Sequence, residues 1–404
     1  MVAGTSPRRT TTRSHAKGIS LGIVGLGSFG SDFVDLFRSH PLVSRVALCD
    51  REPDRVAHWA ERESLQAKLD RGACTDSLDA LCAANLDAIA IFTQPWLHAP
   101  QAVQALEAGK HVYSAVPILT VPDGDEILDW CDRLVATCRR TGQLYMLGET
   151  TYYRPETMYC RRQAAAGAFG RFVYAEGEYF HDVDDPGCSL REVGRLRLSS
   201  AAGQEWVERE RTYAARGIEG GPMHYPTHST CGPVSVMRAH MTKVSAWGQR
   251  NTTDEFYAGR LSNETALFLM SNGATTRIAQ YSEIGHAGQE TFRVFGSEGS
   301  YRDGQWVNKH GPTPLALEEL RDPLPPEVAE AWARELGADF LGGHGGSHAY
   351  LVHEFVDAVA HVRRPAIHVW EAVRYTAPGV VAHQSALRDG ERLDVPDWGD
   401  AAED

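Results

Sequence analysis

Three glycines near the N-terminus have a spacing that suits contact with phosphate groups. Gly25, Gly27 and Gly30 form a Gly-x-Gly-x-x-Gly pattern that follows an apolar run and precedes a helical pattern. The first glycine permits a tight turn, the second lets the backbone approach a pyrophosphate, and the third lets the helix pack against the strand. The free N–H groups of the helix then face the phosphates. We therefore predict a dinucleotide site whose turn includes Ser28 and Phe29.

An acidic residue follows where ribose recognition needs one. Asp50 ends the next apolar run, 20 residues after Gly30. A carboxylate at this position binds ribose hydroxyls and repels a 2′-phosphate, which favours NAD over NADP. Arg51, the next residue, is the one feature here that suits NADP.

Side chains that can transfer protons occur in three later segments. They are Glu149, the stretch from Tyr179 through His181 to Asp184, and the stretch from His224 through Tyr225 to His228. A histidine exchanges protons near neutral pH without a large pKa shift. A tyrosine, whose reference pKa is about 10, needs help to act as a base.

The two histidines of the third segment raise the question of a metal site. His224 and His228 are four residues apart, so on a helix they would share a face and could bind a divalent metal with Glu149 or Asp184. Pro226 lies between them and disfavours a regular helix. We therefore predict no metal site.

The first 150 residues alternate between strand-like and helical patterns. The residues from 125 to 140 show one apolar stripe at three- and four-residue steps. Strands that alternate with helices predict a parallel sheet covered on both faces, which makes residues 19–150 a Rossmann domain. The strand-like runs are Ile19–Gly25, Arg45–Asp50, Asp87–Thr93, His111–Ala115 and Leu144–Gly148.

Beyond about residue 165 the runs become short, β-branched or aromatic, and separated by Gly, Asn or Ser. This texture predicts a mainly antiparallel sheet in a second domain over residues 151–404, so the fold class is α/β followed by α+β. Helices are expected at Ala349–His361 and Trp370–Leu387, with a C-terminal helix able to pack back on the first domain. The polar residues from about 183 to 222 are expected to be a long insertion near the active site.

Composition excludes several classes of protein. With 40 Lys+Arg against 53 Asp+Glu, the net charge of −13 disfavours nucleic acid as a partner. No apolar run reaches ~18 residues, so no membrane span is expected. Eight cysteines without a Cys-x-x-Cys pair disfavour a disulfide scaffold. Residues 1–18 are polar, without the apolar segment of a signal peptide, and predict a disordered tail on a cytoplasmic protein.

After residue 18 the chain resembles the Gfo/Idh/MocA oxidoreductases. The matching stretches are Thr93-Gln-Pro-Trp-Leu-His98, Ala108-Gly-Lys-His-Val112, Gly296-Ser-Glu-Gly-Ser300 and Ser385-Ala-Leu-Arg-Asp-Gly390. The resemblance implies that Thr93, Pro95, His98 and Val116 line the cofactor cleft. Dehydrogenases of this family carry Glu-Lys-Pro where this chain has Ala115-Val116-Pro117, and typically Asp where His224 stands.

This chain resembles one subgroup of that family at the positions where it differs from the dehydrogenases. The NAD-dependent glycoside hydrolases typified by α-N-acetylgalactosaminidases also have Val before the Pro and the Tyr-Pro-Thr-His stretch seen here at 225–228. The resemblance implies transient oxidation of a sugar at C3, elimination at C1, addition of water and re-reduction. It implies that His228 is the base for the C3 hydroxyl, that Tyr179 with His181 acts at C2 or C1, and that Tyr225 and Glu149 position the sugar and ribose or relay protons.

Substrate contacts are assigned to Tyr153, Arg154, His224 and Arg211. The insertion is rich in arginine, and such residues form either a solvated face or a clamp on an anionic sugar substituent, as in a sulfoquinovoside. Alternative functions are an NAD-dependent sugar or cyclitol dehydrogenase and a non-catalytic nucleotide-binding relative. As in the family, we expect a homodimer or homotetramer formed through the outer face of the second sheet.

Overall fold

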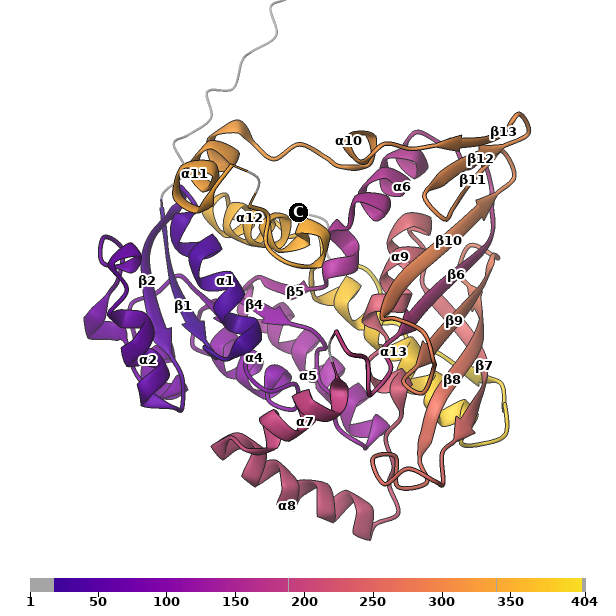
Figure 1. Cartoon of the computed structure of the whole chain (residues 1–404), viewed down its shortest axis with the longest axis horizontal. Coiled ribbons are helices and arrows are strands. Elements are labelled where there is room, and N and C mark those ends of the chain that lie inside the picture. Colours follow the sequence, from indigo (N-terminus) through magenta and orange to yellow (C-terminus); the bar gives the residue numbers. More distant parts are fainter. Residues whose placement is uncertain (1–17, 188, 339, 402–404) are drawn as a thin grey trace, which may run out of the picture.

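The computed structural model describes residues 18–187, 189–338 and 340–401 and contains two β-sheets (Figure 1). The predicted disordered tail lies outside the described residues, apart from Gly18. The first sheet has the strand order β2-β1-β3-β4-β5, and every pairing in it is parallel, as predicted. Its strands are β1 (Ile19–Val24), β2 (Val43–Cys49), β3 (Ala88–Ile91), β4 (His111–Ala115) and β5 (Tyr145–Gly148).

Helices connect these strands and end where local signals place them. All six residues of β1 are buried, as expected for a strand covered on both faces. In α5, Asp123 accepts hydrogen bonds from the backbone N–H groups of Asp125 and Glu126, and Gly142 ends the helix in the left-handed region. The helices of this domain are α1 (Ser28–Ser39), α2 (Pro53–Ala60), α3 (Leu78–Ala83), α4 (His98–Glu107) and α5 (Gly124–Thr141), with short turns η1 (Glu63–Leu65) and η2 (Arg71–Ala73).

The second sheet has the order β13-β12-β11-β10-β6-β9-β8-β7-β14 and is mainly antiparallel, as predicted. Only the β6–β9 pairing among its described strands is parallel. Its strands are β6 (Phe172–Phe180), β7 (Met241–Arg250), β8 (Leu261–Met270), β9 (Thr275–Tyr281), β10 (Gln289–Gly296), β11 (Gly299–Arg302), β12 (Gln305–Asn308), β13 (Gly311–Pro314) and β14 (Leu393–Asp394).

Helix α9 (Thr227–Met237) lies against the inner face of this sheet, with α6 (Pro155–Ala165) and the turns η3 (Thr150–Tyr153) and η4 (Pro222–His224) beside it. Every residue of α9 is buried. The helix comes unusually close to β6, because a Cβ atom on Gly177 would lie 1.8 Å from the carbonyl oxygen of Ser229. Glycine at 177 is therefore what allows the first turn of α9 to touch the strand.

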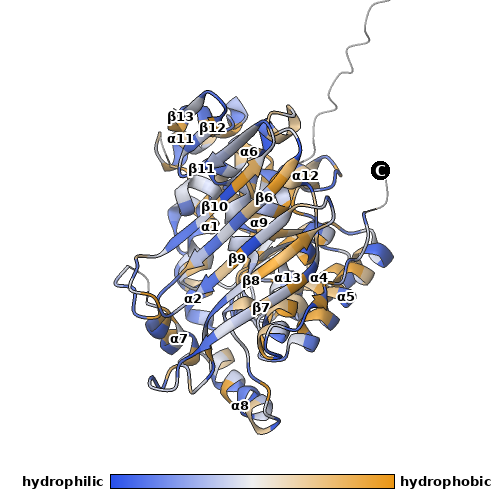
Figure 2. Cartoon of the chain, turned by 90° about the vertical axis from the view of Figure 1, so that its right-hand side faces the viewer, coloured by the Kyte–Doolittle hydropathy of each residue, from blue (hydrophilic) through white to orange (hydrophobic). Residues whose placement is uncertain are grey.

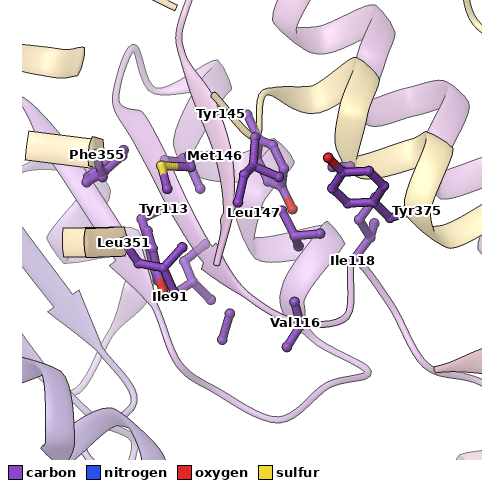
Figure 3. Packing of buried hydrophobic residues seen from close by; sticks show 14 of the residues in the cluster. Ile91, Tyr113, Val116, Ile118, Tyr145, Met146, Leu147, Leu351, Phe355 and Tyr375 are labelled. Carbon is purple, nitrogen blue, oxygen red and sulfur yellow. The ribbon is translucent and has the colours of Figure 1, made fainter. Parts of the chain in front are cut away.

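The C-terminal third of the chain crosses back to the first domain. Helices α11 (Pro326–Leu336) and α12 (Ser347–Ala360), which follow the short α10 (Leu317–Leu320), pack against α1. Trp332 donates a hydrogen bond to the carbonyl oxygen of Leu36, and Phe355 packs edge-on against Phe37 and Tyr113. Figure 3 shows Phe355 and Leu351 of α12 over the strands of the first sheet.

Helix α13 (Val369–Ala386) joins the two sheets, because it packs against α5 on one side and β7 on the other. Just before it, the carbonyl oxygen of Ile367 accepts a hydrogen bond from Leu147 of β5. One buried cluster of apolar side chains thus runs from the first sheet to the second.

The predicted polar insertion forms two helices, α7 (Leu190–Leu198) and α8 (Ala201–Ala215). Each begins at a serine whose side chain accepts a backbone hydrogen bond, Ser189 from Glu192 and Ser200 from Gly203. In Figure 1 the pair lies at the bottom of the molecule, and Arg191 and Glu210 pair with Asp254 and Arg260 of the segment between β7 and β8.

The outer face of the second sheet carries apolar side chains (Figure 2). Trp247, Leu267 and Leu269 are exposed on it, at 53%, 51% and 40% of their surface. Beside them, Arg277 pairs with Glu176 and Glu178. An apolar patch of this kind on a sheet face is typical of an interaction surface. That a second copy of the chain covers it stays a prediction.

The contact between α9 and β6 yields a test of the fold. Gly177→Ala should destabilise the protein by roughly 1–3 kcal/mol, because the new methyl group forces the Ser229 backbone away from the strand. Urea unfolding measures the change. Gly194→Ala on α7 is the matched control, since nothing lies within 4 Å of that site. Equal stability of the two variants would contradict the close contact.

Candidate active site

The predicted glycine turn joins β1 to α1 and fits a dinucleotide. Gly25 has φ +90°, and a Cβ atom on it would lie 2.6 Å from the Phe92 backbone, while one on Gly30 would lie 1.9 Å from the Gly25 oxygen. At Gly27 the nearest atom to such a Cβ is 3.8 Å away. No side chain caps α1. The turn therefore offers an open approach to the first N–H groups of α1, as a bound pyrophosphate requires.

Asp50 lies at the end of β2 beside this turn and is 5% exposed. One carboxylate oxygen accepts a hydrogen bond from the Leu26 backbone at 2.7 Å, and the other accepts from the Glu52 backbone at 2.9 Å. Asp50 therefore holds the glycine turn itself, in addition to the ribose contact assigned to it.

The residues of the Thr93–His98 stretch lie beyond β3, at the expected edge of the sheet. His98 is buried, with Nδ1 2.8 Å from the Pro117 oxygen and Nε2 3.0 Å from the Thr93 oxygen. Its ring therefore links the segments that follow β3 and β4. Thr93 donates its hydroxyl hydrogen to Gln101, Pro95 accepts from the Thr120 backbone, and Val116 is buried.

Three predicted catalytic residues from separate elements form one hydrogen-bonded chain. Glu149 follows β5, whereas Tyr225 and His228 flank the start of α9. His228 Nδ1 donates to Glu149 Oε1 at 2.8 Å, and His228 Nε2 lies 3.0 Å from the Tyr225 hydroxyl. Glu149 Oε1 also accepts from the Thr151 backbone at 2.8 Å, while its buried Oε2 has no hydrogen-bond partner among the described residues.

The other two predicted catalytic residues come from the second sheet and lie next to these hydrogen-bonded residues. Tyr179 and His181 lie on the inner side at the end of β6, with the Tyr179 hydroxyl 2.5 Å from His181 Nδ1. The ring centres of Tyr179 and His228 are 5.0 Å apart. All five predicted catalytic residues are therefore gathered in one place.

Burial and charge set the protonation of the pair at its centre. Burial opposes charge on His228, but the negative charges of Glu149 and Glu290 outweigh it and raise the pKa of His228 to about 9. Burial likewise opposes charge on Glu149, and the His228 charge and hydrogen bond nevertheless hold the pKa of Glu149 below its usual range. The pair is therefore an ion pair at neutral pH, and His228 accepts a proton only after losing its own.

The structure adds Glu290, which the sequence analysis missed. Glu290 on β10 pairs with Tyr179 in register, and its carboxylate lies 2.7 Å from Arg154 and 3.8 Å from His228 Nδ1. Arg154, assigned to substrate contact, is thus at the site. The β-branched and aromatic run within β10 is typical of a strand, but it does not show that this strand pairs with β6.

His344 is a second missed residue of the site. The charges of Glu290, His228, Arg154 and Glu149 all act on it. The signal in the sequence is the run Gly342-Gly-His-Gly-Gly346, whose glycines indicate an unusual backbone around a histidine.

Two residues assigned to substrate contact lie elsewhere. His224 is buried under α13, where its Nδ1 contacts the Val121 oxygen at 3.0 Å and its ring meets His383 at 4.5 Å. Pro226 separates it from α9, so it does not share a helix face with His228. The Arg211 side chain is 72% exposed and pairs with Glu208.

Tyr153, the remaining residue of that set, stacks on Tyr350 with ring centres 6.0 Å apart. It contacts α12, and its assignment to substrate contact stays a prediction. Within the described residues, no three His, Cys, Asp or Glu side chains are arranged to hold a metal ion. Nor does any helix of the described chain have the length and apolarity to cross a membrane.

Helix α8 lies along the edge of the first sheet where ligands bind. Arg51, which comes after β2, makes two hydrogen bonds to Glu205 at 2.9 and 2.7 Å. Trp96, which comes after β3, stacks on Trp206 with ring centres 4.7 Å apart and an angle of 18°. Both indole side chains are buried, whereas the ion pair is exposed, so the stack is the stronger link.

The same helix reaches the segment after β4. Glu126 in the first turn of α5 accepts a hydrogen bond from the Tyr213 hydroxyl at 2.6 Å and pairs with Arg209. Helix α8 therefore contacts, in order, the segments that come after β2, β3 and β4. In an open α/β sheet the dinucleotide crevice lies outside these strand ends, so α8 borders that crevice.

Comparisons with known proteins agree with this geometry. Residues 19–149 match the family model of the GFO_IDH_MocA oxidoreductases, described as an oxidoreductase family with an NAD-binding Rossmann fold. A glycosyl hydrolase family 109 protein of Stenotrophomonas maltophilia (strain K279a) is 25% identical over 423 residues, which cover 96% of this chain and 91% of that protein. An alpha-N-acetylgalactosaminidase of Tannerella forsythia is 23% identical over 415 residues, covering 94% and 86%.

Solved structures show the same fold. The crystal structure of myo-inositol 2-dehydrogenase from Lactobacillus plantarum has a TM-score of 0.66 and 17% sequence identity, and the match covers 94% of this chain and 100% of that one. Residues 19–149 thus match the NAD-binding Rossmann domain of the Gfo/Idh/MocA oxidoreductases, and nearly the whole chain is similar to glycosyl hydrolase family 109 proteins.

Proposed function

We propose that this protein is an NAD-dependent glycoside hydrolase. The observation that carries the proposal is the hydrogen-bonded chain Glu149–His228–Tyr225 with Tyr179 and His181 against it. Elimination across a sugar ring needs one base for a hydroxyl and a second group for the neighbouring C–H, and this cluster supplies both. The similarity to glycosyl hydrolase family 109 proteins supports the same reaction.

Each residue of the cluster acts on a different atom of the sugar. Bound NAD+ supplies a hydride acceptor that can return the hydride later. His228 removes the proton of the C3 hydroxyl, and Glu149 keeps its ring oriented through Nδ1. Tyr179, with His181 as its proton acceptor, removes the acidified C2 proton, after which the C1 substituent leaves. Water then adds to the double bond and the ketone is reduced.

An anionic substituent on the sugar is a further part of this proposal. The charge of Arg197 acts on both His98 and Tyr225, so this arginine of the insertion lies close enough to influence the cluster. A sulfonate or carboxylate on the sugar, as in a sulfoquinovoside, would be favoured by that positive charge.

A panel of chromogenic glycosides tests the function. The protein should cleave at least one of them with no net formation of NADH, and product formed in D2O should carry deuterium at C2. His228→Ala should slow turnover by roughly 10²- to 10⁴-fold, because no base remains for the hydroxyl. Stoichiometric NADH from a free sugar, with no deuterium at C2 of any product, would instead establish a dehydrogenase.

The charge of Glu149 sets a second test. Because Glu149 and Glu290 raise the pKa of His228 to about 9, kcat/KM should increase with pH as His228 loses its proton. Glu149→Gln removes one of these charges, lowers the pKa of His228 and moves the acid limb of the profile to lower pH, at a reduced maximum rate. Profiles of kcat/KM between about pH 6 and 10 measure this, with the exposed Glu330→Gln as control. An unmoved limb in Glu149→Gln would contradict the assignment of His228.

The position of α8 predicts slow release of the cofactor. The protein should retain NAD through purification, and Trp206→Ala should speed its dissociation about tenfold, since an aromatic pair is worth roughly 0.5–1.5 kcal/mol beyond the area it buries. The release of bound nucleotide after dilution gives the rate. Glu208→Gln on the exposed side of α8 leaves the stack intact and should behave as wild type. If the two variants release the nucleotide at the same rate, α8 does not border the dinucleotide crevice.

A further inference from the structure

Two arginines lie beside the acidic residue at the end of β2. Arg51 follows Asp50 directly in the chain, and Arg55 on α2 places its Nη1 atom 3.5 Å from Asp50 Oδ2. An arginine near this acid is how a Rossmann domain accommodates the 2′-phosphate of NADP. The site therefore combines the acid of an NAD-binding protein with cations that suit NADP, and a further group must decide between the two nucleotides.

Asp50 is already engaged on both of its carboxylate oxygen atoms. One oxygen accepts the backbone N–H of Leu26 and lies near Arg55, and the other accepts the backbone N–H of Glu52. For a phosphate that approaches both side chains, the positive charge of Arg55 offsets the negative charge of Asp50. The charge of Arg51 then decides whether a 2′-phosphate is attracted.

That charge is neutralised by Glu205 of helix α8. Arg51 Nη1 donates to Glu205 Oε2 at 2.9 Å, and Arg51 Nη2 donates to Glu205 Oε1 at 2.7 Å. Two parallel bonds of this kind occupy the planar fork with which an arginine binds a phosphate. Arg51 therefore offers the nucleotide site a neutral ion pair instead of a free guanidinium.

The packing of α8 holds Glu205 in this position. The ion pair is exposed, and exposed pairs contribute little stability of their own. The next residue, Trp206, is buried and stacks on Trp96 with ring centres 4.7 Å apart. At the start of the helix, the Ala201 backbone N–H lies 3.4 Å from Glu52 Oε1. The carboxylate is therefore delivered to the end of β2 by contacts on either side of it.

We propose that Glu205 makes the dinucleotide site select NAD+ over NADP+ by occupying and neutralising Arg51. The adenosine ribose of a bound dinucleotide lies at the end of β2, where an acid holds its hydroxyl groups. A phosphate monoester there brings a charge of about −1.5 to −2, which needs an unpaired cation. Glu205 is a positioning residue that acts through Arg51. This inference rests on the NAD binding of the proposed function and is independent of the chemistry on the sugar.

A charge-removing substitution tests the selection. Glu205→Gln keeps the size of the side chain and frees the Arg51 charge, so the affinity for NADP+ relative to NAD+ should rise on the order of tenfold, as expected for such charges about 5 Å apart in water. Each variant is held with both nucleotides, with NADP+ in increasing excess, until exchange is complete. The protein is then desalted and denatured, and the two released nucleotides are quantified. Glu208→Gln, one turn along α8, removes the same charge from the pair with Arg211 and should leave the ratio unchanged.

A second substitution shows whether Glu205 acts through Arg51. Adding Arg51→Ala to Glu205→Gln should return the ratio to within about twofold of the wild-type value, because the freed cation is then absent. The gain in Glu205→Gln alone should also shrink in about 1 M salt, where the Debye length is about 3 Å.

Three outcomes would overturn the inference. They are an unchanged ratio in Glu205→Gln, a gain that persists without Arg51, and faster release of both nucleotides at an unchanged ratio, which would make the ion pair only a latch for α8. In each of these cases a wild type that retains NAD+ leaves the proposed function standing. A wild type that binds neither nucleotide, or that prefers NADP+, contradicts the NAD dependence of the proposed function and this inference together.

Discussion

The close approach of α9 to β6 is the contact on which the candidate site depends. The carbonyl oxygen of Ser229 lies directly against Gly177, which has no side chain to keep it away. Two residues further along β6 is Tyr179, and one residue before Ser229 is His228, so this contact fixes the distance between their rings. A larger residue at 177 would separate the two groups that the proposed chemistry needs side by side. The reaction therefore depends on a residue with no functional group of its own.

A second constraint is electrostatic. Glu149 and His228 are both buried, and a buried charge is tolerated only when it is paired and hydrogen-bonded. Each charge stabilises the charged form of the other residue, and the Thr151 backbone donates a further hydrogen bond to the carboxylate. Removal of either partner would leave an isolated charge, so the two positions are expected to vary together in related chains.

Local signals in the sequence predicted the parallel sheet and the glycine turn, whereas the resemblance to a known family supplied the five predicted catalytic residues that the structure brings together. Strand periodicity, glycine spacing and short motifs are read from neighbours in the chain. Glu290 has no such signal, since it reaches the site through the pairing of β10 with β6. His224 illustrates the opposite error, because the sequence suggested a site residue that the structure places elsewhere. Its spacing of four residues from His228 does not put the two on one helix face, since α9 begins after Pro226. The course of α8 is likewise decided by Trp96, which lies more than a hundred residues away.

The return of α11 and α12 to the first domain bears on how the protein unfolds. Trp332 and Phe355 cover α1 and Tyr113, which an isolated N-terminal fragment would leave bare. Separate domains melt separately only where few apolar contacts cross between them. Here one apolar cluster spans both sheets, and α13 connects them, so we expect the two halves to unfold in a single cooperative transition. The predicted boundary near residue 150 would therefore cut through a continuous apolar core, and fragments divided there would each expose part of it.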